Sequence, residues 1–239
     1  MNPILGALLI LISATAAASG LDRDTLLTEA PATPDRGTVR ISGAGNTQVE
    51  QASTHSGVSG SILWSPINHL AGDIGGYWQG ANAGPTVRVR YQFLSQAQQG
   101  IDLAGGVRYK SVGFLPANSE LEFLLAAGHR FGAVDVIVNL VVGHELLGPG
   151  MDGELKAFVG YRPGESVRVG LDARVAAEFH DENGYKLPEM TNDVGFTGGP
   201  AVIWIPTERL VVQGLLGVSK PRGLSTASPA AILTVSFDF

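Results

Sequence analysis

The feature that most constrains this chain is a run between Val167 and Phe179 in which every second residue is apolar and most of the residues between them are charged. Odd-numbered positions carry only Val, Leu, Ala or Phe, whereas the even-numbered positions include two Arg, one Asp and one Glu. Successive side chains of a β-strand point to opposite faces of the sheet. The segment therefore predicts a strand with one apolar face and one charged face, because the 3.6-residue period of a helix would mix the two sets.

The same period of two recurs along most of the chain after Thr38. Clear cases lie at residues 86–93, 101–110, 120–131, 134–143, 154–162 and 231–239, and weaker ones at 37–50, 55–64, 69–79, 192–205 and 209–219. With residues 167–179 these make about 12 strands, within an expected range of about 10 to 12. Pro200 lacks a backbone donor and predicts a bulge or an irregular strand there.

Two kinds of connection separate the predicted strands. Residues 65–68, 161–165 and 206–208 look like tight turns, whereas residues 180–193 and 220–228 are longer and polar or rich in Gly, Pro and Ser. Membrane barrels have short periplasmic turns and longer outer loops, and an even strand number brings both chain ends to the periplasm. We predict an all-β fold, an antiparallel transmembrane β-barrel with periplasmic N- and C-termini.

A soluble β-sandwich also alternates, and the pattern alone leaves that fold open. Three features favour lipid outside the sheet. The apolar face of residues 167–179 suits a strand of ~9–11 residues tilted across a bilayer, Gly and Ala are common on the charged face, and aromatic residues cluster near the predicted strand ends, where they form girdles in membrane barrels. These aromatic residues are Trp64, Trp78, Tyr91, Phe93, Tyr109, Phe131, Tyr161, Phe179 and Trp204.

The chain divides into three predicted parts. Residues 1–20 predict a signal peptide, because a short apolar core at residues 4–12 precedes small residues with A-x-A spacing. No Lys or Arg precedes that core, so an N-terminal membrane anchor or a disordered tail stays as the alternative. Residues 21–36, with Pro31 and Pro34, predict a flexible leader, and residues 37–239 predict the barrel.

The composition excludes several classes of function. The net charge is −6, and no run of Lys or Arg suggests a nucleic-acid partner. The absence of cysteine excludes disulfides, thiolate metal sites, cysteine catalysis and lipid attachment at a cysteine. The adjacent His180, Asp181 and Glu182 lack the ligand spacing of a metal site, and we expect no metal and no cofactor.

The end of the chain resembles that of known membrane proteins. Residues 231–239 alternate and finish with Phe239 at the carboxyl terminus, which resembles the terminal strand of Gram-negative outer-membrane β-barrel proteins. That resemblance implies an outer-membrane location, contact with outer-membrane lipids, and recognition of Phe239 by the barrel-assembly machinery. Residues 199–206 are also similar, more weakly, to the closing hairpin of small transporter-like barrels tied to aromatic-compound degradation.

Charged residues on the second face of the strands are expected to point into the lumen. These are Arg88, Arg90, Asp102, Arg108, Lys110, Glu120, Glu122, Arg130, Asp135, Glu154, Lys156, Arg168, Asp172, Arg174 and Glu178. They predict either a polar pore whose charges bias permeation or a salt-bridge network that closes the lumen. Their signs nearly balance, which predicts weak ion selectivity.

The leading hypothesis is a non-enzymatic narrow channel or small-molecule transporter, with a small-molecule solute as partner. The alternative is a non-conducting structural or surface-binding barrel with a plugged lumen. A lipid hydrolase barrel is a third hypothesis, based on His55–Ser56 and on residues 180–182, although the chain carries no nucleophile elbow.

Overall fold

A computed structural model of the chain describes residues 21–50, 53–79, 82–112, 115–181, 184–185, 188–189 and 193–239. The predicted signal peptide lies outside the described residues. Within them, thirteen strands and one short helix occur. The elements are β1 (Val39–Glu50), β2 (Ser53–Ile67), β3 (Leu70–Gln79), β4 (Asn82–Leu94), α2 (Gln96–Gln99), β5 (Asp102–Val112), β6 (Leu115–Phe131), β7 (Val134–Glu145), β8 (Met151–Tyr161), β9 (Val167–Asp181), β10 (Gly184–Tyr185), β11 (Val194–Trp204), β12 (Leu210–Lys220) and β13 (Ser228–Asp238).

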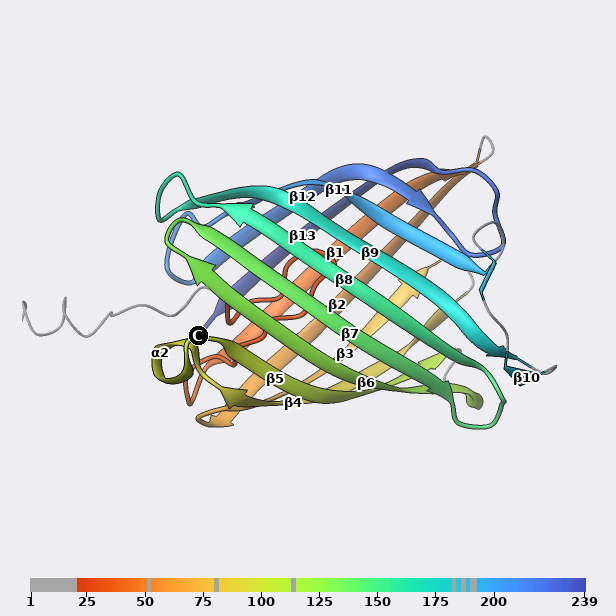
Figure 1. Cartoon of the computed structure of the whole chain (residues 1–239), viewed down its shortest axis with the longest axis horizontal. Coiled ribbons are helices and arrows are strands. Elements are labelled where there is room, and N and C mark those ends of the chain that lie inside the picture. Colours follow the sequence, from red (N-terminus) through yellow and green to blue (C-terminus); the bar gives the residue numbers. More distant parts are fainter. Residues whose placement is uncertain are drawn as a thin grey trace, which may run out of the picture.

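The strands form one antiparallel sheet that closes on itself (Figure 1). β13 pairs with β1, and β8 pairs with β9, so the sheet has no open edge along its wall. The two-residue β10 extends the far end of β9 as a hairpin. Twelve of the thirteen strands therefore make the barrel, and the predicted antiparallel β-barrel and its strand number are confirmed. No helix among the described residues is long and apolar enough to cross a membrane.

Most side chains on the outer face of the barrel are apolar, and the charged side chains of the strands mostly point inward. On β9, Leu171 is 63% exposed, whereas the neighbouring Asp172 is fully buried inside the barrel. Aromatic side chains also face outward at the barrel end that carries the short connections, residues 132–133, 162–166 and 205–209, called the turn end below. These are Trp64, Phe131, Tyr161, Trp204 and Phe239, each between 51% and 65% exposed.

β11 passes Pro200 without a change of register. Pro200 pairs with Leu171 of β9 in an unbroken ladder. On the β12 side, pairs form at Gly198 and then again at Ala201 in the same register. The prediction of a bulge is therefore wrong. The irregularity that was also predicted is a gap in the ladder between β11 and β12, at the point where proline supplies no N–H.

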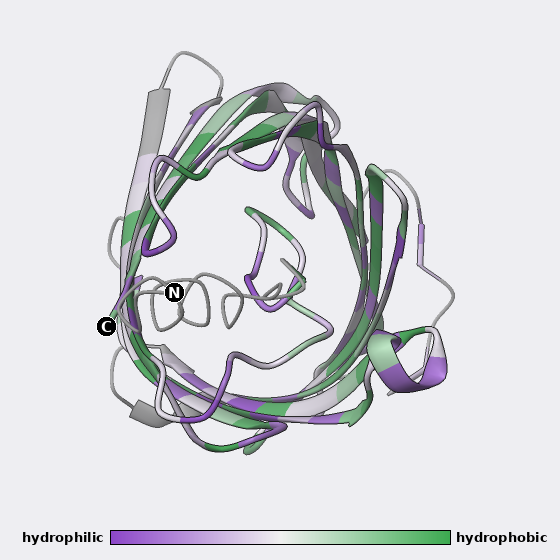
Figure 2. Ribbon diagram, turned by 90° about the vertical axis from the view of Figure 1, so that its left-hand side faces the viewer, coloured by the Kyte–Doolittle hydropathy of each residue, from purple (hydrophilic) through white to green (hydrophobic). Residues whose placement is uncertain are grey.

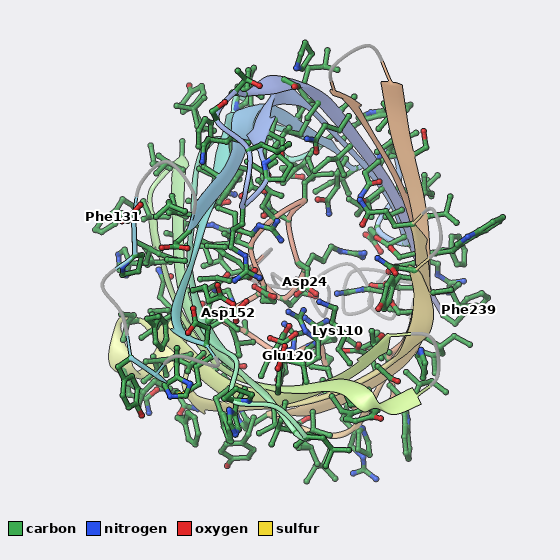
Figure 3. All side chains as sticks on the ribbon, turned by 90° about the vertical axis from the view of Figure 1, so that its right-hand side faces the viewer. Asp24, Lys110, Glu120, Phe131, Asp152 and Phe239 are labelled. Carbon is green, nitrogen blue, oxygen red and sulfur yellow. The ribbon has the colours of Figure 1, made fainter. Side chains whose placement is uncertain are left out.

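The interior holds the segment predicted as a flexible leader, which is the main departure from the sequence prediction. Residues 21–36, the lumen segment below, precede β1 and fold into the barrel (Figures 2 and 3). Leu21, Thr28 and Ala30 have no exposed surface. The segment is ordered by contacts with the wall, because its own sequence has two prolines and no strand period.

Candidate functional site

Apolar packing holds one side of the lumen segment. Leu21 and Ala32 join a buried cluster with Ile137, Phe158 and Ile203, which belong to β7, β8 and β11. These wall residues point inward although they are apolar, so the lumen has an apolar strip opposite its polar surfaces. Burying a Leu side chain completely stabilises the contact by ~1.5–3 kcal/mol, which favours a docked segment.

Asp24 of the lumen segment joins two arginines of β4. Its carboxylate lies 2.6 Å from Arg88 Nη2 and 2.8 Å from Arg90 Nη1. Arg90 also donates to the carbonyl oxygen of Ala30 at 3.0 Å and is 1% exposed. Burial alone would raise the pKa of Asp24, but the two guanidinium groups outweigh it and hold the pKa far below its usual value. Asp24 is therefore the counter-ion of a buried guanidinium.

Glu29 makes the second charged contact of the lumen segment. Its Oε1 lies 2.8 Å from Lys156 Nζ and 3.2 Å from Arg108 Nη1. Its backbone N–H donates to Asn139 Oδ1 at 2.7 Å, and Asn139 Nδ2 donates to its carbonyl oxygen at 2.9 Å. Burial would raise the pKa of Glu29, but the neighbouring Lys156 and Arg108 lower it. The contact therefore joins the segment to three strands.

Hydrogen bonds fix the rest of the segment. Asp172 of β9 accepts from the Thr25 hydroxyl at 2.6 Å and from the Leu27 N–H at 2.9 Å. Towards the start of β1, the Ser65 hydroxyl donates to the carbonyl oxygen of Pro34 at 3.0 Å. The segment is thus held by β9 near its start and by β2 near its end.

A cluster of four charges lies where the lumen segment meets the turn end. Arg40 Nη2 lies 2.9 Å from Asp22, and Arg40 Nε lies 2.7 Å from Asp238. Arg23 reaches the other oxygen of Asp238 at 2.6 Å. Because Asp238 precedes the terminal Phe239 and Arg40 belongs to β1, the segment, the first strand and the last strand are joined at one point.

The structure places the predicted lumen residues on the inward side of their strands. Arg88, Arg90, Arg108, Lys156 and Asp172 contact the lumen segment. Charged residues of the wall also pair with one another, namely Arg108–Glu122, Lys110–Glu120, Lys156–Glu154, Arg174–Glu154, Arg130–Asp135 and Arg168–Asp135.

Two predicted lumen residues lie apart from these pairs. Asp102 accepts from Gln92 and from the Gln96 N–H near the turn end. Glu178 follows Arg174 on the inward side of β9.

Sequence reasoning missed the acidic residues of the lumen segment and several of their partners. The sequence pattern places Asp22, Asp24 and Glu29 in a free leader and does not single out their partners Arg40 and Asn139. One signal was present in the sequence: the segment's acidic residues match the Arg and Lys residues predicted to face the lumen. Opposite charges that share an enclosed space are expected to pair.

The lumen segment leaves part of the interior empty. A cavity of about 690 Å³ lies between the segment and the wall formed by β13, β1, β2 and β3. It follows the whole inward side of β1, from Arg40 through Ser42, Ala44 and Asn46 to Gln48. Small and polar residues line this wall, so the cavity suits water and polar solutes.

The residues of the hydrolase hypothesis do not form a site among the described residues. Ser56 is exposed and donates to the Thr47 hydroxyl at 3.3 Å. The His180 ring contacts the carbonyl oxygen of Pro149 and the Tyr185 ring. The His55 side chain and Glu182 lie outside the described residues. The described part of the chain also contains no group of three His, Cys, Asp or Glu residues that suits a metal ion.

A closed barrel with an apolar outer face and a polar, ion-paired interior defines the class of outer-membrane β-barrel proteins. No family model and no curated protein matches the chain in sequence. Solved structures match in fold. A KdgM porin shares 11% identity and superposes with a TM-score of 0.61 over 84% of this chain and 99% of that chain.

Two further solved barrels are similar. A NanC porin has 8% identity and a TM-score of 0.64 over 84% of this chain and 100% of that chain. An outer-membrane channel from Pseudomonas putida F1 has 8% identity and a TM-score of 0.59 over 87% of this chain and 97% of that chain. At such identities the likeness shows the fold, and all three of these barrels are porins or channels.

Docking of the lumen segment is expected to resist mild acid and to weaken only in strong acid. The pKa values of Asp24 and Glu29 are both lowered in the folded protein. Lowered carboxyl pKa values stabilise the docked state above the ordinary value of about 4 and lose that effect as the pH falls through the lowered values. A nitroxide on Leu26→Cys should stay immobile from pH 8 to 5 and gain mobility only in strong acid, well below pH 4. Release between pH 8 and 5 would contradict this assignment.

Proposed function

We propose that the chain is a narrow channel, or a transporter for small polar solutes, in the outer membrane of a Gram-negative bacterium. The observation that carries the proposal is the polar cavity along β1, which runs from Arg40 at the turn end to Gln48 near the other end of the barrel. A solute would pass between the lumen segment and the wall formed by β13, β1, β2 and β3. The fold shared with porins supports the same function.

The placement in the membrane follows from the same proposal. Residues 1–20 would direct secretion, and the turn end, with the start of β1 and Phe239, would face the periplasm. Phe239 N–H donates to the carbonyl oxygen of Val39 at 2.8 Å, and its ring packs against Phe237 with centroids 4.9 Å apart. The exposed terminal aromatic is then available to the barrel-assembly machinery, and the outward aromatic side chains would contact lipid headgroups.

Planar bilayers test the channel directly. The refolded protein is expected to give small, discrete conductance steps, because the lumen segment fills much of the interior and leaves one narrow path. The insertion control is the band shift of the same sample on a gel before and after boiling. Protein that inserts and shifts on the gel but stays silent at all voltages would refute the channel.

The second candidate function is a non-conducting barrel, and the ion pairs of the lumen segment favour it. Arg23, Arg40 and Asp238 lie across the turn end of the cavity and make three contacts of 2.6–2.9 Å with each other and Asp22. A silent bilayer with inserted protein would select this function. Neither candidate uses catalysis, and we propose that the chain is not an enzyme.

A further inference from the structure

The charges that line the cavity are unbalanced, although those of the whole wall nearly balance. Positive side chains at the cavity surface are Arg23, Arg40, Arg88, Arg90, Arg108, Lys110, Lys156 and Arg174. Negative side chains at the same surface are Asp24, Glu29 and Asp73. Eight positive groups against three negative groups leave a surface that favours anions.

Two of the negative side chains that pair with these cations do not reach the cavity surface. Lys110 pairs with Glu120 at 3.6 Å, and Arg174 pairs with Glu154 at 3.6 Å, but neither glutamate lines the cavity. The side chains of Lys110 and Arg174 are 38% and 42% exposed, against 22% and 17% for Glu120 and Glu154. The Lys110 side chain reaches past Glu120 into the lumen (Figure 3), and the long Arg174 side chain likewise lines the cavity where its partner Glu154 does not.

Lys110 and Arg174 also differ from the other cations of the cavity. Arg88 and Arg90 form ion pairs with Asp24 of the lumen segment, and Lys156 forms one with Glu29. Within the described part of the chain, Lys110 and Arg174 form no ion pair with the lumen segment, and their ion pairs with the wall, at 3.6 Å, are the longest among the cations of the cavity. Their N–H groups can therefore donate hydrogen bonds to a ligand that enters the cavity from the end opposite the turn end.

From this arrangement we infer that the cavity selects small anions, with Lys110 and Arg174 as the groups that contact them. The inference rests on the proposed channel and names its solute class: carboxylates and comparable small anions. A guanidinium offers two parallel donors to a carboxylate, and an ammonium adds a mobile point charge. The near balance of inward charges predicted weak ion selectivity. In the structure, most of the positive side chains reach the cavity surface, whereas several of the negative side chains lie farther from it.

The test is the reversal potential in a KCl gradient across a planar bilayer. The wild-type channel is expected to pass chloride in preference to potassium, and potassium acetate in place of KCl should give the same sign. One charge about 4 Å from an ion in water changes its occupancy about fivefold. The double variant Lys110→Gln/Arg174→Gln should therefore lose several-fold in the permeability ratio, and Lys110→Glu/Arg174→Glu should reverse the preference.

Arg209→Gln is the matched control, because Arg209 is exposed in a turn-end connection and does not line the cavity. It should keep the wild-type reversal potential. Each variant must show the gel shift of a folded barrel. Conducting wild-type channels without preference for anions would overturn the inference and leave the channel standing. Preference that survives in the double variant would overturn the role of the two residues, and no current at all would overturn the channel itself.

Discussion

Deleting residues 22–35 is expected to raise the single-channel conductance several-fold. The segment fills one side of the lumen, where Ala32 joins the cluster with Ile137 and Phe158, and it narrows the path to the cavity beside β1. A barrel of this strand number has room for a wider lumen once no segment fills it. The measurement is the step size in planar bilayers, with the wild type under the same salt.

The barrel itself should survive the deletion. Its wall is closed by continuous ladders between neighbouring strands, and none of these pairs involves residues 22–35. Arg88 and Arg90 lose Asp24, but water enters the widened lumen and hydrates them, so no charge stays buried without a partner. The gel shift on boiling should therefore match that of the wild type.

A Gly/Ser linker of equal length is the control for this deletion. It restores the chain length without the ion pairs or the apolar contacts, so it should conduct like the deletion and not like the wild type. Equal steps in the wild type and the deletion would show that the lumen segment does not limit the path.

The fold was predictable because one physical rule governs every strand. Lipid outside and an enclosed polar interior force a period of two, and in residues 167–179 every odd-numbered position is apolar while all four charges lie at even-numbered positions. Strand pairing then follows from chain order, since neighbouring strands pair along the whole wall. Even β11, which the proline made doubtful, keeps its register.

The lumen segment was not predictable in the same way. Its residues follow no period, and Pro31 and Pro34 are typical of a free linker. Its burial comes from partners far away in sequence, such as Asn139 with Glu29 and Asp172 with Thr25. The sequence also does not predict how far each charged side chain extends into the lumen. Alternation assigns Lys110 and Glu120 to the same face, but only the structure shows that Lys110, and not Glu120, lines the cavity.

Replacing Asp24 by Asn is expected to undock the lumen segment while the barrel stays folded. Arg90 is 1% exposed and would keep only the carbonyl oxygen of Ala30 as a partner. Removing one partner of a buried ion pair costs about 3–5 kcal/mol, and the lower end applies because the Asp24 side chain is 35% exposed. About 3 kcal/mol corresponds to roughly a hundredfold shift towards the undocked state, seen as long-lived openings of larger conductance.

The double variant Asp24→Asn/Arg90→Met separates a lost ion pair from general damage. It removes the buried guanidinium together with its counter-ion and leaves an unbranched apolar side chain in its place. Such paired replacements are often neutral, so the double variant should return towards the conductance of the wild type. If it conducts like Asp24→Asn alone, the uncompensated charge is not the cause.

A disulfide shows whether movement of the segment causes the openings. A Cβ at Gly128 would lie 3.3 Å from Cβ of Pro31, close to the ~3.5–4.5 Å of natural disulfides, and the chain has no other cysteine. Adding Pro31→Cys and Gly128→Cys to the Asp24→Asn variant should restore small steps under oxidising conditions, and reduction should bring back the large openings. Large openings that persist in the oxidised, cross-linked protein would mean that they arise elsewhere in the barrel, because the cross-link holds the segment against β6.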